Sequence, residues 1–199
     1  MPFHSCFSPE MGCAVYVWHI QESVEELEVL LPQVDVPASR SQQRRKERLA
    51  VRLLLQQANV TGLAYEESGK PILTDGRYIS ISHSHDWVCV ALHDSRPIGI
   101  DLECFSDRML ALSPRFMNTE ELASLPHDKT VMHLVWCAKE AAYKIYGDTL
   151  VDFRASMTVL PFVLSVGGGT FFLQLKTCGA RLTMKYMLNA EYALVYSIL

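Results

Sequence analysis

Apolar and polar residues divide the chain into short strand-like and helix-like stretches. Residues 13–20 (CAVYVWHI) are rich in β-branched and aromatic side chains, which favour an extended strand. The same pattern predicts further strands over 78–84, 87–92, 98–105, 153–166, 170–175, 180–188 and 192–199. The run Gly167-Gly168-Gly169 predicts a hairpin turn, because it lacks the Lys-Ser/Thr pair and the helix that follow a phosphate-binding loop.

Capping residues and apolar spacing predict four helices, over 23–31, 41–59, 118–125 and 131–146. Ser23 and Thr130 are expected to cap the first and the last of them, and Gly147 to end the last. Pro32 and Pro37 are expected to stop the first helix. Helix is followed by strands in each half of the chain, which favours an α+β fold with two similar lobes.

The composition is that of a globular protein. With 199 residues, 49% hydrophobic and 20% charged, the chain can bury a core in one domain or two small ones, and it is unlike a disordered chain. The net charge of −4 does not support broad nucleic-acid binding. The charge is uneven, because residues 40–52 hold six basic residues and one acid and so carry +5. Such a segment favours contact with an anion, although a solvated helix face explains it equally well.

The six cysteines form no C-x-x-C pair and no zinc-like cluster with histidine. We therefore expect reduced thiols and a cytoplasmic location. We also expect no signal peptide and no contact with a membrane, because the N-terminus lacks the required pattern and no apolar run reaches about 18 residues.

Two carboxylates share one face of the strand predicted at Ile-Gly-Ile-Asp-Leu-Glu-Cys (98–104). Side chains alternate along a strand, so Asp101 and Glu103 lie on the same side as Gly99, opposite an apolar face. Two such oxygen donors suit a hard cation such as Mg²⁺. The competing interpretation is a strand whose outer face is merely acidic.

A second cluster lies on the helix predicted over 131–146. Trp136, Glu140 and Lys144 follow each other at intervals of four residues and form one ridge, with Lys139 and Tyr143 on the next. Glu140 can supply a third carboxylate to a metal, and the lysines can hold phosphate oxygens. An ordinary solvated Glu–Lys pair, with the tryptophan in the core, is the alternative.

Two shorter motifs carry weaker signals. Ser80-Ile81-Ser82-His83-Ser84 offers hydroxyls and an imidazole to a phosphate, but capped turns explain it as well. Lys70 and Pro71 in the turn over 66–71 (EESGKP) can lie beside a nucleotide or simply form that turn. A G-x-S-x-G nucleophile elbow is missing from the sequence, so nothing specifies a hydrolase.

Together these motifs resemble the 4′-phosphopantetheinyl transferase superfamily. Over roughly residues 40–147 the order is GKP (69–71), ISHS (81–84), IGIDLE (98–103), FMNTEEL (116–122) and WCAKEAAYK (136–144). The resemblance is greatest to the larger, pseudo-dimeric bacterial type that activates surfactin synthetase. It implies transfer of the phosphopantetheine group of coenzyme A to a serine of an apo acyl or peptidyl carrier protein, with Mg²⁺ and release of 3′,5′-ADP.

The resemblance implies roles for the carboxylates and lysines. Asp101, Glu103 and Glu140 are the expected Mg²⁺ ligands, and Lys144 and Lys139 are expected to neutralise the pyrophosphate. Glu140 is also the expected general base, acting directly or through a water on the metal.

Coenzyme contacts follow from the same resemblance. His83 and Ser82 are expected at the 3′-phosphate, and Lys70 and Pro71 beside the adenine. An arginine of the basic segment is expected at a coenzyme phosphate, with Arg45, Arg48 and Arg52 all open and the last two favoured. Glu121 matches a family acid with a structural or metal-proximal role.

The resemblance also implies a fold and an assembly. We expect two α/β lobes related by pseudo-twofold symmetry, spanning 1–97 and 98–199, with the active site at their interface and the chain a monomer. His85 and Cys137 depart from the residues common in the family, Gly and Ser or Thr, and bear on substrate range. Two alternatives stay open, namely a silent coenzyme- or carrier-binding protein of this fold and an unrelated Mg²⁺-dependent phosphohydrolase.

Overall fold

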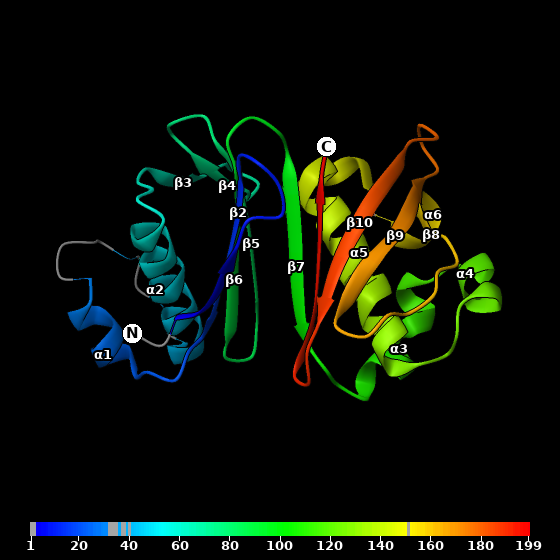
Figure 1. Ribbon diagram of the computed structural model, residues 1–199, viewed down its shortest axis with the longest axis horizontal. Coiled ribbons are helices and arrows are strands. Elements are labelled where there is room, and N and C mark those ends of the chain that lie inside the picture. The colour runs from blue at the N-terminus through cyan, green and yellow to red at the C-terminus, as the bar shows by residue number, and fades with distance from the viewer. Residues whose placement is uncertain (1–2, 32–35, 37–38, 40, 151) are drawn as a thin grey trace. The chain divides into compact units, whose positions relative to one another are not determined.

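A computed structural model describes the chain except for residues 1–2, 32–35, 37–38, 40 and 151 (Figure 1). Pro32 and Pro37, predicted to stop the first helix, and Arg40 of the basic segment lie outside the described residues. The chain divides into two compact units, Met1–Arg96 and Pro97–Leu199. In the part of the chain that is described, no helix has the length and apolar character needed to cross a membrane.

The first unit is an antiparallel sheet covered on one face by two helices (Figure 1). The strand order is β1-β2-β6-β5, with β1 at Phe3–Phe7, β2 at Cys13–His19, β5 at Tyr78–Ser84 and β6 at Trp87–His93. The helices are α1 (Val24–Val29) and α2 (Gln42–Gln57). A small hairpin of β3 (Leu63–Tyr65) and β4 (Pro71–Leu73) completes the unit.

The helices of the first unit begin where the sequence predicts. Ser23 caps α1 in a capping box, in which its hydroxyl accepts from the Glu26 amide and the Glu26 carboxylate accepts from the Ser23 amide. Ser41 caps α2, and the apolar face of that helix packs Leu49 and Leu54 into a core that contains Trp18. The predicted strands β2, β5 and β6 are confirmed. The short strands β1, β3 and β4 carry no pattern that predicts them.

The second unit is an antiparallel sheet with the long helix α5 (Lys129–Tyr146) packed against it. The strand order is β7-β11-β10-β9-β8, with β7 at Ile98–Cys104, β8 at Met157–Val159, β9 at Gly168–Leu175, β10 at Arg181–Leu188 and β11 at Tyr192–Ile198. Shorter helical segments are α3 (Arg108–Phe116), α4 (Thr119–Ser124), η1 (Gly147–Leu150) and α6 (Phe153–Ser156).

Four details of the second unit differ from the prediction. Only Met157–Val159 of the strand predicted at 153–166 forms a strand, and the residues before it form α6, because Asp152 accepts two backbone N–H bonds there. Helix α3 forms in a stretch without a predicted element. Asp128 rather than Thr130 caps α5. The glycine run is not a turn as a whole, because Gly168 and Gly169 already pair with β10.

Candidate functional site

The acidic face of β7 packs against α5, and Gly99 permits that contact. A Cβ atom on Gly99 would lie 2.0 Å from the carbonyl oxygen of Ala141, so any side chain would push the helix off the strand. Asp101, two residues further on, is therefore held between strand and helix and is 4% exposed. The alternative of an acidic strand face open to solvent is wrong for this residue.

Lys144 reaches Asp101 from the last turn of α5. Its Nζ donates to Asp101 Oδ1 at 2.7 Å and to the Ile100 carbonyl at 2.8 Å. The ridge predicted on the helix thus faces β7 rather than solvent, and the interpretation as a solvated Glu–Lys pair is wrong.

Glu103 and Glu140 complete the acidic cluster. The indole Nε1 of Trp136 donates to Glu103 Oε1 at 3.3 Å, which ties the carboxylate to the helix. The pKa of Glu140 is raised from 4.5 to about 7, mainly by burial and next by the charge of Asp101; Lys144 lowers it and Glu103 adds a smaller increase. A carboxyl that responds to both other acids lies close to them.

The donor set of Asp101, Glu103 and Glu140 matches what a hard divalent cation prefers, because all three supply carboxylate oxygens from two packed elements. Within the described part of the chain, however, no three His, Cys, Asp or Glu side chains converge closely enough to enclose a metal ion. The residues fit a metal in chemistry and neighbourhood, while Asp101 is engaged with the Lys144 ammonium.

A largely apolar cavity of about 720 Å³ opens beside these acids. Glu103 and Glu140 lie on its wall next to the aromatic rings of Trp136, Phe116 and Phe153. The rings of Phe116 and Trp136 meet edge to face, with centroids 5.2 Å apart. The cavity can hold a slender ligand with an apolar portion against the rings and an anionic portion near a cation held by the acids.

Lys139 corrects a prediction. Its side chain is 0% exposed, and its ammonium donates to Glu121 Oε2 at 2.7 Å and to the Phe116 carbonyl at 2.8 Å. Further carbonyls, of Phe153 and Met157, lie at 3.2 and 3.3 Å. Burial lowers the pKa of Lys139, and Glu121 partly offsets this effect. The ammonium is enclosed by protein, so it does not reach a pyrophosphate.

Glu121 has the structural role of the two that its motif left open. It is fully buried and forms a capping box with Asn118 at the start of α4. Its Oε1 accepts from the Val159 amide at 2.6 Å. Together with Lys139 it joins α4, α5 and β8.

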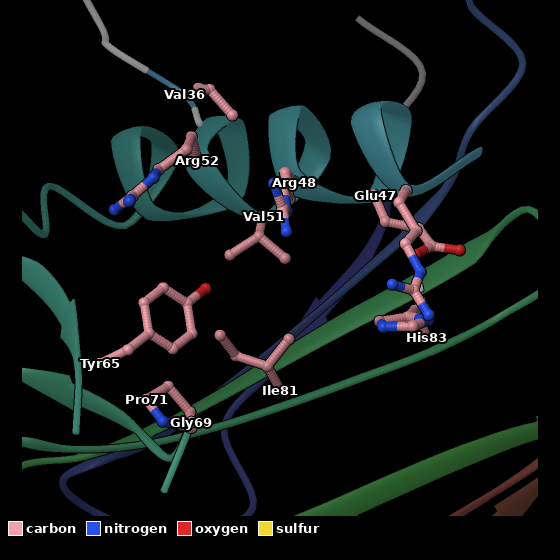
Figure 2. Close-up of a pocket in the computed structure, with 11 residues that line it drawn as sticks. Val36, Glu47, Arg48, Val51, Arg52, Tyr65, Gly69, Pro71, Ile81 and His83 are labelled. Carbon is pink, nitrogen blue, oxygen red and sulfur yellow. Dashed lines mark ion pairs between the residues drawn. The ribbon is translucent and has the colours of Figure 1, made fainter. Parts of the chain in front are cut away.

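In the first unit, α2 and the strands beneath it enclose a second cavity, of about 510 Å³ (Figure 2). Figure 2 shows Glu47 and His83 together at one end and Tyr65 and Pro71 at the other. The cavity is lined by Val36, Arg44, Glu47, Arg48, Val51, Arg52, Tyr65, Gly69, Pro71, Ile81 and His83. Its walls combine guanidinium groups with a flat aromatic ring, which suits a phosphorylated ligand that carries a planar base.

The structure separates the arginines of the basic segment. Arg48 and Arg52 line the cavity, while Arg45 is held by Glu28 of α1 at 2.7 Å. Arg44, four residues before Arg48, also lines it. The Glu47 carboxylate lies 3.4 Å from His83 Nδ1, so it orients the imidazole and neutralises part of the positive charge. Three arginines against one glutamate leave the cavity cationic.

Two predicted coenzyme residues lie outside this cavity. Ser82 alternates with His83 along β5, so its side chain is buried on the opposite face of the strand. Unlike His83, Ser82 does not line the cavity, and its predicted contact with the 3′-phosphate stays a prediction. Lys70 is exposed and does not line the cavity, although Gly69 and Pro71 on either side of it do.

Sequence reasoning missed Arg44, Glu47 and Tyr65. Arg44, Arg48 and Arg52 follow one another at intervals of four residues and so lie on a single helix ridge. This spacing could have identified Arg44. Tyr65 has no such signal, because it reaches the cavity through a hairpin that the sequence does not predict.

The segment that carries the acidic cluster matches the sequence profile of an enzyme family. The sequence profile of the 4′-phosphopantetheinyl transferase superfamily matches residues 97–194. The chain belongs to this superfamily. The resemblance to the superfamily that the motifs indicated is therefore confirmed.

Curated relatives agree with that assignment. The chain is 35% identical over 89 residues to the 4′-phosphopantetheinyl transferase psf-1 of Bacillus pumilus, covering 41% of this chain and 38% of that protein. It is 29% identical over 134 residues to AcpT of Salmonella typhimurium, covering 62% and 70%. It is 36% identical over 92 residues to Sfp of Bacillus subtilis, covering 43% and 41%. The chain thus spans less than half the length of two of these three relatives.

Proposed function

We propose that the protein transfers the 4′-phosphopantetheine group of coenzyme A to a serine hydroxyl of an apo acyl or peptidyl carrier protein, with release of 3′,5′-ADP. The observation that carries the proposal is the cluster of Asp101, Glu103, Glu140 and Lys144 where β7 packs on α5. The family and the names of the relatives support the same reaction.

The cationic cavity of the first unit is proposed to bind the nucleotide end of coenzyme A. Arg48 and Arg52 supply charge-assisted hydrogen bonds to phosphate oxygens, and His83, oriented by Glu47, supplies another donor. Tyr65 and Pro71 offer flat apolar surface to the adenine.

The acids of the second unit are proposed to hold Mg²⁺ through Asp101, Glu103 and Glu140. When bound, the metal supplies positive charge against the charge that builds up on the pyrophosphate oxygens during transfer. Lys144 adds a second positive charge beside the acids. The bond from the serine oxygen to phosphorus forms as the bond from phosphorus to the 3′,5′-ADP oxygen breaks.

Glu140 is the proposed acceptor of the serine proton. In the metal-free chain its pKa is raised to about 7, mainly by burial, so the Glu140 carboxylate takes up a proton more readily than an ordinary carboxylate. The apolar cavity beside it, walled by Trp136, Phe116 and Phe153, is proposed to receive the pantetheine chain and to limit water at the reacting phosphorus.

The proposal extends to the type and setting of the enzyme. We propose the larger type with two lobes related by pseudo-twofold symmetry, acting as a monomer in the cytoplasm. The division into two units, each with its own sheet, supports the two-lobe type. All six cysteines lie within the described residues and are thiols rather than disulfides, which supports a reducing compartment.

A direct test is incubation of the protein with coenzyme A, Mg²⁺ and a panel of apo carrier proteins, followed by mass spectrometry of the carriers. Transfer adds the mass of one phosphopantetheine group to a serine and produces one 3′,5′-ADP per carrier. Tight binding of coenzyme A without a mass shift on any carrier would identify a silent relative instead. Release of free phosphopantetheine without carrier would identify a hydrolase.

Glu140→Gln isolates the acidic cluster. The substitution keeps the shape of the side chain but removes a proton acceptor and a metal ligand, so turnover should fall by about 10³-fold or more. Glu120→Gln is the matched control, because Glu120 is an exposed carboxylate of the same unit whose distance to Lys176 is 4.0 Å. Near-normal turnover of Glu140→Gln would remove the proposed role.

A further inference from the structure

The contact between Lys144 and Asp101 has a consequence for metal binding. The ammonium lies 2.7 Å from Asp101 Oδ1 and 2.8 Å from the Ile100 carbonyl oxygen. The two side chains are 24% and 6% exposed, so the pair is largely withdrawn from solvent. Within the chain, Lys144 therefore already supplies a cation to a carboxylate that the proposed function gives to a metal.

The surroundings are acidic. The charges of Asp101 and Glu103 raise the pKa of Glu140, whereas the charge of Lys144 lowers it, so all three groups act electrostatically on the Glu140 carboxyl. An ammonium and a divalent cation on the same carboxylate repel each other, and this repulsion is strong where water is largely excluded. The ammonium and the metal therefore cannot both bind Asp101 as tightly as either would alone.

We propose that Lys144 is an internal counter-ion that competes with the divalent metal for Asp101. It neutralises Asp101 in the metal-free chain and gives up its contact with Asp101 Oδ1 when the metal binds. This inference rests on the proposed function, because it takes Asp101 as a metal ligand. The ammonium that leaves Asp101 becomes available to an anionic group of the ligand, so metal binding and anion capture by Lys144 are linked.

The test measures binding of Mg²⁺ or Mn²⁺ to the full chain by calorimetry, without coenzyme or carrier. Lys144→Met removes the charge and keeps the length of the side chain, so it should tighten metal binding by about tenfold or more. Lys144→Gln provides a second neutral variant in case the first folds poorly. Lys144→Arg keeps the charge and should stay within about threefold of the wild type.

Lys129→Met is the matched control, because Lys129 lies on the same helix and pairs with exposed Asp107. Its metal affinity should equal that of the wild type. Thermal unfolding with and without metal gives a second readout. The neutral Lys144 variants should be less stable than the wild type in chelator and should gain more from added metal, because their acids lack the internal cation.

The outcomes separate this inference from the proposed function. Unchanged or weaker metal binding in both neutral variants, with clear binding in the wild type, overturns the competition and leaves the metal site intact. Failure of the wild type and of every variant to bind either metal overturns the metal site itself. Tighter binding confined to the neutral Lys144 variants supports the competition.

Discussion

The buried pair of Lys139 and Glu121 allows a sharp test of whether a lysine in this helix serves the fold or the ligand. Lys139 is fully buried on α5, and Glu121 is fully buried at the start of α4. We consider three perturbations: Lys139→Met, Glu121→Gln and the two together. Methionine replaces the aliphatic stem at similar volume, and glutamine keeps the shape of the carboxylate, so charge is the main change.

The contacts set the size of the effect. Glu121→Gln leaves the buried Lys139 ammonium without a counter-charge. Its single amide oxygen also cannot accept both backbone N–H hydrogen bonds that Glu121 accepts, from Asn118 at 2.8 Å and from Val159 at 2.6 Å. Lys139→Met leaves a buried carboxylate without its cation. Breaking a buried pair on one side costs about 3–5 kcal/mol, so each single variant should lose stability in that range.

The double variant should cost less than the sum of the single ones. Once both charges are gone, neither partner leaves an uncompensated ion, so the interaction energy in the cycle should reach about 2 kcal/mol or more. Urea unfolding followed by circular dichroism and fluorescence measures all three free energies at one pH. A loss of less than about 1 kcal/mol of unfolding free energy in the single variants would refute the reasoning, because leaving a buried ion without its partner costs more than that.

The same variants distinguish a structural role from a coenzyme contact. Lys139→Met that is still folded should bind coenzyme A as the wild type does, because its ammonium touches only Glu121 and main-chain carbonyls within the described residues. Weaker coenzyme binding at unchanged stability would return Lys139 to the ligand site.

Three further predictions concern the site and its packing. In chelator, the metal-free chain should lose stability as the pH rises, because the pKa of Glu140 is raised from 4.5 to about 7, mainly by burial. The folded state favours the protonated carboxyl, so the stability that this group contributes below pH 4.5 is lost as the pH rises through 7. The shift corresponds to about 3 kcal/mol, or about 1–2 kcal/mol after solvent screening, and urea unfolding near pH 5 and 8 should show it in the wild type but not in Glu140→Gln. Gly99→Ala should cost about 2 kcal/mol or more in unfolding free energy, because its Cβ would lie 2.0 Å from the Ala141 carbonyl oxygen. Arg48→Gln should weaken coenzyme A binding in calorimetry by about tenfold or more, whereas Arg45→Gln, whose guanidinium is held by α1, should leave it within about twofold.

Much of the fold follows from local patterns in the sequence. Strand β6 is a run of apolar and β-branched residues, and α1 starts at a capping box that is legible at Ser23 and Glu26. The stretch 153–166 defeated the same rules. Its apolar residues resemble a strand, but Asp152 caps the helical turn α6, and only Met157–Val159 forms a strand.

The candidate site was predictable where one element carries its residues. Alternation along β7 places Asp101 with Glu103, and the helical period joins Glu140 to Lys144. The cavity of the first unit needed contacts between distant segments. Tyr65 and Arg48 line the same cavity, one from a hairpin and the other from a helix, and the local sequence of neither segment predicts this.

The contrast between Lys139 and Lys144 shows why spacing alone does not identify a functional residue. Both lysines lie on α5, on neighbouring ridges, and the sequence pattern of each is compatible with phosphate binding. The helix is buried on several sides, from Val131 to Ala142, so its pattern of apolar residues does not reveal which ridge meets the core. What decides is the element packed on each ridge. Glu121 of α4 pairs with Lys139 where both are fully buried. Strand β7 instead places Asp101 beside Lys144, which stays partly exposed at the proposed metal site.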